Sequence, residues 1–111
     1  MLGGGRLRWP LRRVLVSGPS MSPTLRHGDA VLIRSTGRIR PGDVVVARFA
    51  GTPDRLVVKR AIRRGASGWW LEGDNPYGSD DSRRYGEADV LGRVLVRYWP
   101  RPGRLPPRNS S

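Results

Sequence analysis

Six short apolar runs, separated by turns rich in glycine and proline, constrain the fold of this chain more than any other feature. Each run is rich in Val, Ile, Leu or aromatic residues, the types enriched in β-strands. The runs are RVLVS (13–17), AVLIR (30–34), VVVARF (44–49), RLVVKRAI (55–62), GWWLE (68–72) and VLGRVLVRYW (90–99). No segment repeats apolar residues with a helical period over ten positions. The chain is therefore predicted to be all-β or mostly β, with short antiparallel strands.

The turns between these runs and the length of the chain set the domain organisation. Pro41 and Gly42 fit the central pair of a type II turn, in which the glycine takes a positive φ. With 111 residues, the chain can bury one modest core. We predict one domain over residues 13–99, a loose basic segment at 1–12 and a disordered Pro/Arg tail at 100–111.

The residue types that the chain lacks exclude several functions. It has no cysteine and a single histidine, His27, which excludes disulfides, Cys-ligated metals and thiol catalysis. We therefore expect no cofactor and no metal site. No apolar run approaches the roughly 20 residues of a membrane span, and no secretory signal peptide is visible. These features predict a cytoplasmic chain, or one bound peripherally to a membrane.

The net charge of +12 permits two interpretations. The arginines are scattered along the chain, which favours a generic basic surface over one dedicated binding site. An anionic partner is the alternative, and the arginines of residues 6–13 could lie against anionic lipid. A basic β module that binds nucleic acid would rest on charge alone, because no basic patch is interleaved with aromatic residues. We therefore expect no nucleic acid partner.

The chain has 21 basic residues, of which only Lys59 is a lysine. Arginine stays protonated, whereas a desolvated lysine can lose its proton and act as a general base. In a strand, Val57, Lys59 and Ala61 share one face, so the amine would have apolar neighbours. The alternative is a lysine that extends its ammonium to water.

Two further stretches could supply chemistry. SGPSMSPTL (17–25) offers four hydroxyls in a non-helical context, suited to a rigid loop that holds a nucleophile near backbone N–H groups. A triad using His27 is the less favoured alternative, because that residue lies in a turn beside Asp29. GDNPYGSDDSRRYG (73–86) is a dense polar loop that could be a plain surface loop or a cation site, but it lacks the spacing of an EF-hand.

Together these stretches resemble the type I signal peptidase family of serine proteases with a Ser/Lys dyad. Its nucleophile motif is matched by Ser20-Met21-Ser22-Pro23-Thr24-Leu25, and its Val-Lys-Arg segment by Val58-Lys59-Arg60. Its Gly-Asp-Asn loop is matched by Gly73-Asp74-Asn75 with Ser79-Asp80-Asp81-Ser82-Arg83. The motifs occur in the right order over residues 14–99.

The resemblance implies a small signal-peptidase-like, repressor-protease-like β fold and a role for each matched residue. Ser20 would be the nucleophile and Lys59 its general base, with Ser79 orienting the amine. The supporting loop would comprise Gly73, Asp74, Asn75, Asp81 and Arg83, the last two forming an ion pair. The oxyanion hole would use the Ser20 N–H with help from around Gly18, where the family often has a hydroxyl. Met21 and Pro23 would line a groove for an extended peptide.

The chain departs from typical members of that family in two ways. No N-terminal membrane span is visible in the sequence, and the thirteen residues between Lys59 and Gly73 leave no space for the family's inserted second domain. It therefore most resembles the branch identified as maturation proteases of nickel-type superoxide dismutase. The expected function is an endopeptidase that removes an N-terminal extension from a precursor, with the dismutase precursor as the expected substrate. The alternative is a conventional signal peptidase that acts on exported proteins and whose membrane anchor is missing because of a wrongly chosen start codon.

Overall fold

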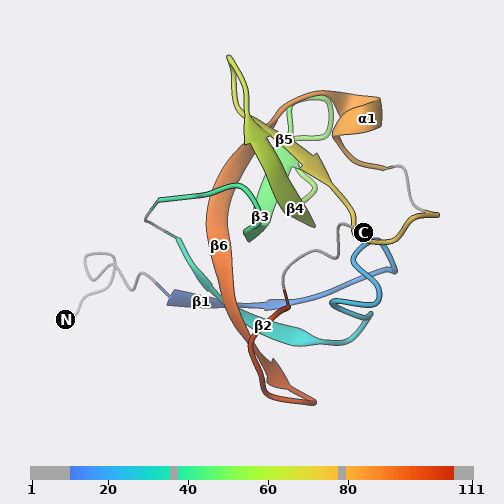
Figure 1. Ribbon diagram of the computed structural model, residues 1–111, viewed down its shortest axis with the longest axis vertical. Helices are drawn as coiled ribbons and strands as arrows, with labels where there is room; N and C mark the ends of the chain where they lie inside the picture. The colour runs from blue at the N-terminus through green and yellow to red at the C-terminus, as the bar shows by residue number, and fades with distance from the viewer. Residues whose placement is uncertain (1–10, 36–37, 78–79, 107–111) are drawn as a thin grey trace.

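The computed structural model describes residues 11–35, 38–77 and 80–106 (Figure 1). Within them, six strands and one short helix follow one another along the chain. They are β1 (Leu11–Leu15), β2 (Ala30–Arg34), β3 (Val44–Phe49), β4 (Val57–Arg64), β5 (Trp69–Glu72), α1 (Ser82–Tyr85) and β6 (Ala88–Trp99). The prediction of a mostly β fold of short antiparallel strands is confirmed.

The strands form one antiparallel sheet in the order β1-β2-β6-β3-β4-β5. The long strand β6 joins its two halves, because it pairs with β3 through Ala88–Arg93 and with β2 through Arg93–Trp99. A further pairing of Trp69 with Ala88 connects β5 back to β6. The strands β3, β4, β5 and β6 therefore curl into a closed unit, from which β1 and β2 extend along the lower part of β6 (Figure 1).

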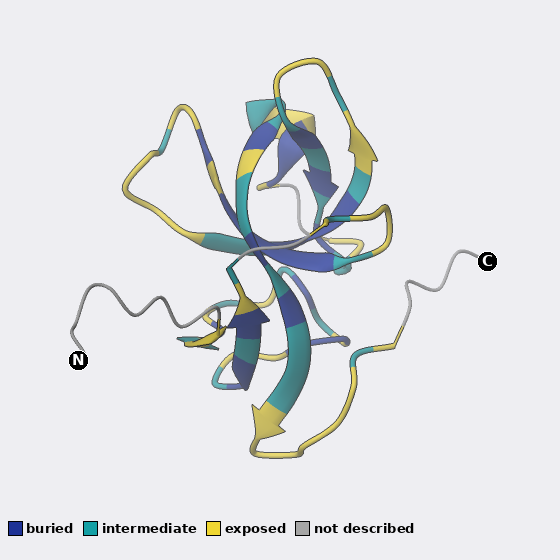
Figure 2. Cartoon of the chain, turned by 90° about the vertical axis from the view of Figure 1, so that its left-hand side faces the viewer, coloured by how far each residue is buried: buried dark blue, intermediate teal, exposed yellow. Residues whose placement is uncertain are grey.

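Two core clusters lie against the curved sheet, and many of the buried residues belong to its central strands (Figure 2). The first cluster contains Val16, Met21, Leu25, Val31, Ile33, Val44, Val46 and Val94. The second contains Val45, Ala47, Phe49, Ala61, Trp69, Leu71 and Ala88. Alternate residues of β3 serve different clusters, as expected for a strand that is covered on both faces.

The predicted strands agree with the structure where turn chemistry marks their ends. The runs 30–34 and 44–49 form β2 and β3 with the predicted bounds, and Gly42 before β3 has a φ of 98°. The run 55–62 is displaced, because the Arg55 N–H donates to the Thr52 carbonyl in a turn and the strand begins at Val57. Helix α1 was not predicted, since a four-residue helix has no periodic apolar face to reveal it.

Parts of the two segments expected to be loose are structured. Leu11 and Arg12 belong to β1, and Gly103 exchanges two backbone hydrogen bonds with Arg97. Leu105 packs against the first core cluster, which explains why the chain turns back after β6. The rest of both segments, 1–10 and 107–111, lies outside the described residues. None of the helices in the described ranges is long and apolar enough to cross a membrane.

Candidate active site

A cleft of about 860 Å³ brings the two principal candidate residues, Ser20 and Lys59, to one place. It lies between β1, with the loop that follows it, and the start of β4. Its lining is formed by residues 14–20 and 55–59 together with Val46, Asn75, Tyr77 and Asp80. Residues 39 positions apart in sequence therefore face a common space because the curved sheet brings β1 and β4 across from each other.

The loop that carries Ser20 is held by buried anchors and by the polar loop after β5. Met21 and Leu25 are fully buried in the first core cluster. The Asn75 backbone N–H donates to the Ser20 carbonyl at 2.9 Å, and its side-chain Nδ2 donates to the Pro19 carbonyl at 3.0 Å. Ser20 itself is only half-buried. The loop is thus fixed on both sides while its hydroxyl-bearing residue remains at the cleft.

This arrangement corrects the expectation that Met21 and Pro23 line the substrate groove. Met21 is completely buried in the core, so it cannot contact a substrate. Pro23 is exposed and is not among the residues that line the cleft. Met21 anchors the loop by its burial in the first core cluster, while residues 14–20 line the cleft.

Gly73 touches the backbone of Ser20. A Cβ added to Gly73 would lie 2.6 Å from the Ser20 carbonyl oxygen and 3.5 Å from the Ser20 Cβ. The first distance is too short for any real Cβ, so only glycine allows the two loops to approach this closely. The first residue of the Gly-Asp-Asn motif therefore determines where Ser20 lies.

Lys59 is buried in β4, with 4% of its surface exposed. It pairs with Val45 of the second core cluster, and Val57 and Ala61 of the same strand also pack there. Burial lowers the pKa of the Lys59 amine below its ordinary value of 10.5, and the negative charges of Asp81 and Asp80 oppose this effect only in part. Burial therefore shifts the equilibrium of the Lys59 amine towards its neutral form.

An ion pair beside Lys59 connects three segments of the site. Arg60 is 2% exposed, and its Nη2 donates to Asp74 Oδ2 at 2.6 Å. The Thr24 hydroxyl donates to the same oxygen at 2.6 Å, and Arg60 Nη1 donates to the Gly42 carbonyl at 2.8 Å. Arg60 and Thr24 were matched by motif but given no role in the sequence analysis. The sequence alone could not assign these roles, because it does not distinguish a buried, paired arginine from an arginine on the surface.

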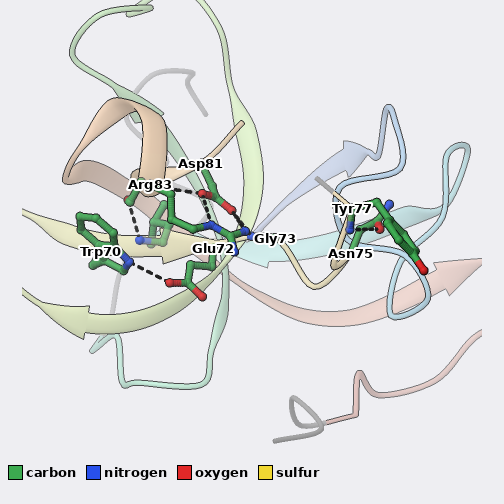
Figure 3. Close-up of polar contacts among 9 residues, drawn as sticks. Trp70, Glu72, Gly73, Asn75, Tyr77, Asp81 and Arg83 are labelled. Carbon is green, nitrogen blue, oxygen red and sulfur yellow. Dashed lines mark hydrogen bonds and ion pairs between the residues drawn. The ribbon is translucent and has the colours of Figure 1, made fainter. Parts of the chain in front are cut away.

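Asp81 organises the end of the polar loop (Figure 3). Its carboxylate accepts from the Gly73 N–H at 2.9 Å, from the Arg83 N–H at 3.1 Å and from the Arg83 guanidinium at 2.6 Å. Burial raises the pKa of Asp81, but these hydrogen bonds from Arg83 and Gly73 outweigh it and place the pKa below its ordinary value of 3.8. The expected ion pair between Asp81 and Arg83 is present, and it also fixes Gly73.

The loop does not have the character of a cation site. Asp74 pairs with Arg60, Asp81 with Arg83, and Asp80 with Arg84 at 3.1 Å. Each of these carboxylates is already neutralised by an arginine. In the described part of the chain, no group of three or more His, Asp or Glu residues could hold a metal ion. The expected lysine-orienting residue, Ser79, lies outside the described residues.

The remaining expected residue, Gly18, makes an unexpected contact. Its backbone N–H donates to Nδ1 of His27 at 3.0 Å. The Gly18 N–H can therefore serve an oxyanion only if it exchanges this bond for one to the substrate. His27 is exposed and is not among the residues that line the cleft, so the geometry does not favour the triad that would use it.

Comparison with known proteins identifies the family. The Peptidase S24-like family model matches residues 11–95, which include β1 through most of β6 and the whole candidate site. The chain belongs to the Peptidase S24-like family. It is accordingly a serine-type peptidase, and its resemblance to signal peptidases is supported at the level of the family.

The relatives are named mitochondrial proteases. The mitochondrial inner membrane protease subunit 1 of Xenopus tropicalis is 35% identical, over 78% of this chain and 68% of the relative. The corresponding human protein is 33% identical, over 78% and 69%. The mitochondrial ATP-independent inner membrane protease subunit 1a of Arabidopsis thaliana is 33% identical, over 84% and 73%. Each alignment is longer than the number of residues that this chain contributes to it. The relatives therefore have insertions within the matched region.

Proposed function

We propose that this peptidase cleaves a precursor protein through an acyl-enzyme formed on Ser20, with Lys59 as the general base. The observation that carries the proposal is the burial of the sole lysine in the cleft that Ser20 also lines, with a lowered pKa. A neutral amine can take a proton from a serine hydroxyl, whereas an ammonium cannot.

The residues around the cleft can be given successive roles in that reaction. Lys59 removes the proton from the Ser20 hydroxyl as its oxygen attacks the scissile carbonyl carbon. The Ser20 N–H stabilises the resulting oxyanion, with Gly18 as a second donor once its amide is released from His27. The Lys59 ammonium then protonates the leaving amine. In the second half, Lys59 activates the water that hydrolyses the ester. Ser79 is proposed to orient the amine, and Gly73, Asp74, Asn75, Asp81 and Arg83 to support the loop.

The form of the substrate follows from two strand edges. Among the described residues, β1 pairs with β2 alone, and β4 pairs with β5 only from Arg60 onward. The edges at residues 14–17 and 55–58 are both on the cleft. An extended peptide placed between them can add to the sheet through main-chain hydrogen bonds. Leu15, Leu56 and Val57 give this groove an apolar lining, which favours apolar substrate side chains.

The substrate is proposed to be a precursor that carries a removable N-terminal extension. The short segment between Lys59 and Gly73 resembles the branch of maturation proteases for nickel-type superoxide dismutase. This resemblance favours the nickel superoxide dismutase precursor as the substrate. The second candidate is an exported protein that carries a signal peptide. The names of the relatives, which are inner membrane proteases, favour this second candidate. We propose a cytoplasmic location for the chain, with peripheral contact with the membrane.

Cleavage of the two candidate precursors tests the proposal. The purified chain and its Ser20→Ala and Lys59→Arg variants are incubated with each precursor, and the product N-terminus is read by mass spectrometry. We expect one cut that disappears in both variants. Ser20→Ala removes the nucleophile, and an arginine at position 59 cannot lose its proton and so cannot act as the base. Circular dichroism of each variant controls for folding. Full cleavage by either folded variant would refute the dyad, and the precursor that is cut decides the substrate.

A further inference from the structure

The peptide group between Ser17 and Gly18 borders the cleft, but its N–H is turned away from it. That N–H donates to Nδ1 of His27 at 3.0 Å, and His27 is not among the residues that line the cleft. The peptide bond is trans, because cis bonds occur in the described chain only before Pro23 and Pro100. In a trans peptide the N–H and the C=O point in opposite directions. The Gly18 N–H therefore points out of the cleft, and the Ser17 carbonyl points to the opposite side.

The surrounding backbone fixes His27 beside this peptide. The Val16 N–H donates to the Asp29 carbonyl, and the Gly28 N–H donates to the Val16 carbonyl, each at 2.8 Å. The buried carboxylate of Asp29 accepts from the Arg26 N–H at 2.9 Å and closes the turn. The turn that carries His27 is thus bonded to the residue at the end of β1, which keeps the imidazole within reach of the peptide N–H.

The peptide itself can rotate between two anchored neighbours. In the described part of the chain, its one hydrogen bond is the bond to His27. The Pro19 carbonyl that follows is held by Asn75 Nδ2 at 3.0 Å. Gly18 has a φ of 86°, and a half-turn of the peptide takes this angle to a negative value, which every residue tolerates. Rotation therefore requires little more than the loss of the bond to His27.

The two orientations of this peptide differ in what they offer to the reaction. With the bond to His27 in place, the Gly18 N–H is not available to an oxyanion in the cleft. After a half-turn it faces the cleft and can donate to the oxyanion together with the Ser20 N–H. The loss of one such donor typically lowers kcat about 100-fold to 1,000-fold. The orientation of this single peptide group therefore bears directly on the rate.

We propose that His27 is a positioning residue that holds the Ser17–Gly18 peptide in an inactive orientation until the oxyanion forms. The oxyanion is charged and accepts a hydrogen bond more strongly than the neutral imidazole, so it takes the Gly18 N–H from His27 as the charge develops. This catalytic consequence rests on the proposed function, whereas the bond to His27 needs no catalysis. Because Nδ1 accepts, the ring proton of the neutral imidazole is assigned to Nε2.

NMR tests the bond to His27 without a substrate. The ring nitrogen signals are unambiguous because the chain has one histidine. For the neutral ring we expect the proton on Nε2. The Gly18 amide should exchange with solvent about fivefold faster in His27→Ala, as for the loss of one neutral hydrogen bond, and within about twofold of the parent in His27→Asn, whose Oδ1 is again an acceptor. A proton on Nδ1, or unchanged exchange in His27→Ala, would overturn the proposal.

Cleavage kinetics test the role of this bond, with the precursor that the parent chain cuts as the substrate. We expect His27→Ala to raise kcat about threefold to tenfold and to leave KM within about twofold, because the bond is exchanged only in the transition state. His27→Asn should stay close to the parent. A purely structural histidine would instead give a lower kcat and a lower melting temperature on truncation. A kcat equal to or below that of the parent in folded His27→Ala would contradict the positioning role.

Gly18→Ala releases the same peptide without a change at His27. Alanine disfavours the positive φ of the inactive orientation, and its Cβ would meet nothing within 4 Å. We expect a rise in kcat similar to that of His27→Ala and no further rise in the double variant, because both changes remove one restraint. Additive gains would show that the two residues act separately and would overturn the proposal. If the parent chain cuts neither precursor, the proposed function and this catalytic role both fail, while amide exchange still decides whether His27 holds the peptide.

Discussion

At the scale of single residues, the contact between Gly73 and Ser20 is the tightest constraint on the proposed nucleophile. The Gly73 N–H is held by Asp81, and its Cα faces the Ser20 carbonyl with no space for a Cβ. Neither loop can yield easily, because the Asn75 N–H also bonds the Ser20 carbonyl. The position of Ser20 in the cleft is therefore set by a glycine, which has no side chain that could take part in the reaction.

Replacing Gly73 with alanine should move Ser20 by about an ångström and lower kcat/KM at least about 100-fold, because displacements of this size disrupt attack geometry. The measurement is precursor cleavage, with thermal unfolding to confirm the fold. Gly103→Ala is the matched control, since a Cβ there would meet nothing within 4 Å. Activity of Gly73→Ala within a few-fold of the parent would contradict the role given to this contact.

At the scale of elements, Asp81 connects the end of β5 to the start of α1. Its carboxylate accepts hydrogen bonds from Gly73 and Arg83 and begins the helix as its N-cap. Because its pKa in the folded state lies below 3.8, its ionised form stabilises the protein. That contribution is fully present above the unfolded pKa and is lost as the pH falls through the folded pKa.

Asp81→Asn should therefore lower the free energy of unfolding at pH 7 by about 2 kcal/mol, the scale of hydrogen bonds to a charged group. The difference from the parent should begin to shrink as the pH falls below the unfolded pKa of about 3.9, and it should be lost as the pH falls through the folded pKa, where the carboxyl becomes neutral like the amide. Urea unfolding at pH 7 and pH 3 measures it. Asp80→Asn, which breaks only the exposed pair with Arg84, should change the value by less than about 1 kcal/mol. A constant difference at both pH values would contradict this account of Asp81.

The elements also show what the sequence could and could not predict. The strands bounded by clear turns, such as β2 and β3, were predictable because turn residues and apolar patterning agree there. The burial of Met21 was not, since one apolar residue in a polar loop gives no direction for its side chain. The partner of Arg60 was also unpredictable, because Asp74 lies fourteen residues away and only the sheet brings them together.

At the scale of the whole molecule, the sheet brings together three segments that are far apart in sequence. The first core cluster anchors the loop of Ser20, and the second covers the face of β4 that carries Lys59. The pair of Arg60 and Asp74 connects β4 to the loop after β5. The lowering of the Lys59 pKa is thus a product of folding, since burial in the assembled sheet is its largest cause.

The direct test of this central claim is the titration of Lys59 by NMR, which is unambiguous because a lysine-selective label reports one side chain. We predict a midpoint below 10.5 in the folded protein that returns to about 10.4 in urea. Asp80→Asn should lower the midpoint further and Arg55→Gln should raise it, because the first removes a stabilising negative charge and the second a repelling positive one. A folded-state midpoint at or above 10.5 would contradict the account, because Lys59 would then remain protonated and could not accept the proton of Ser20.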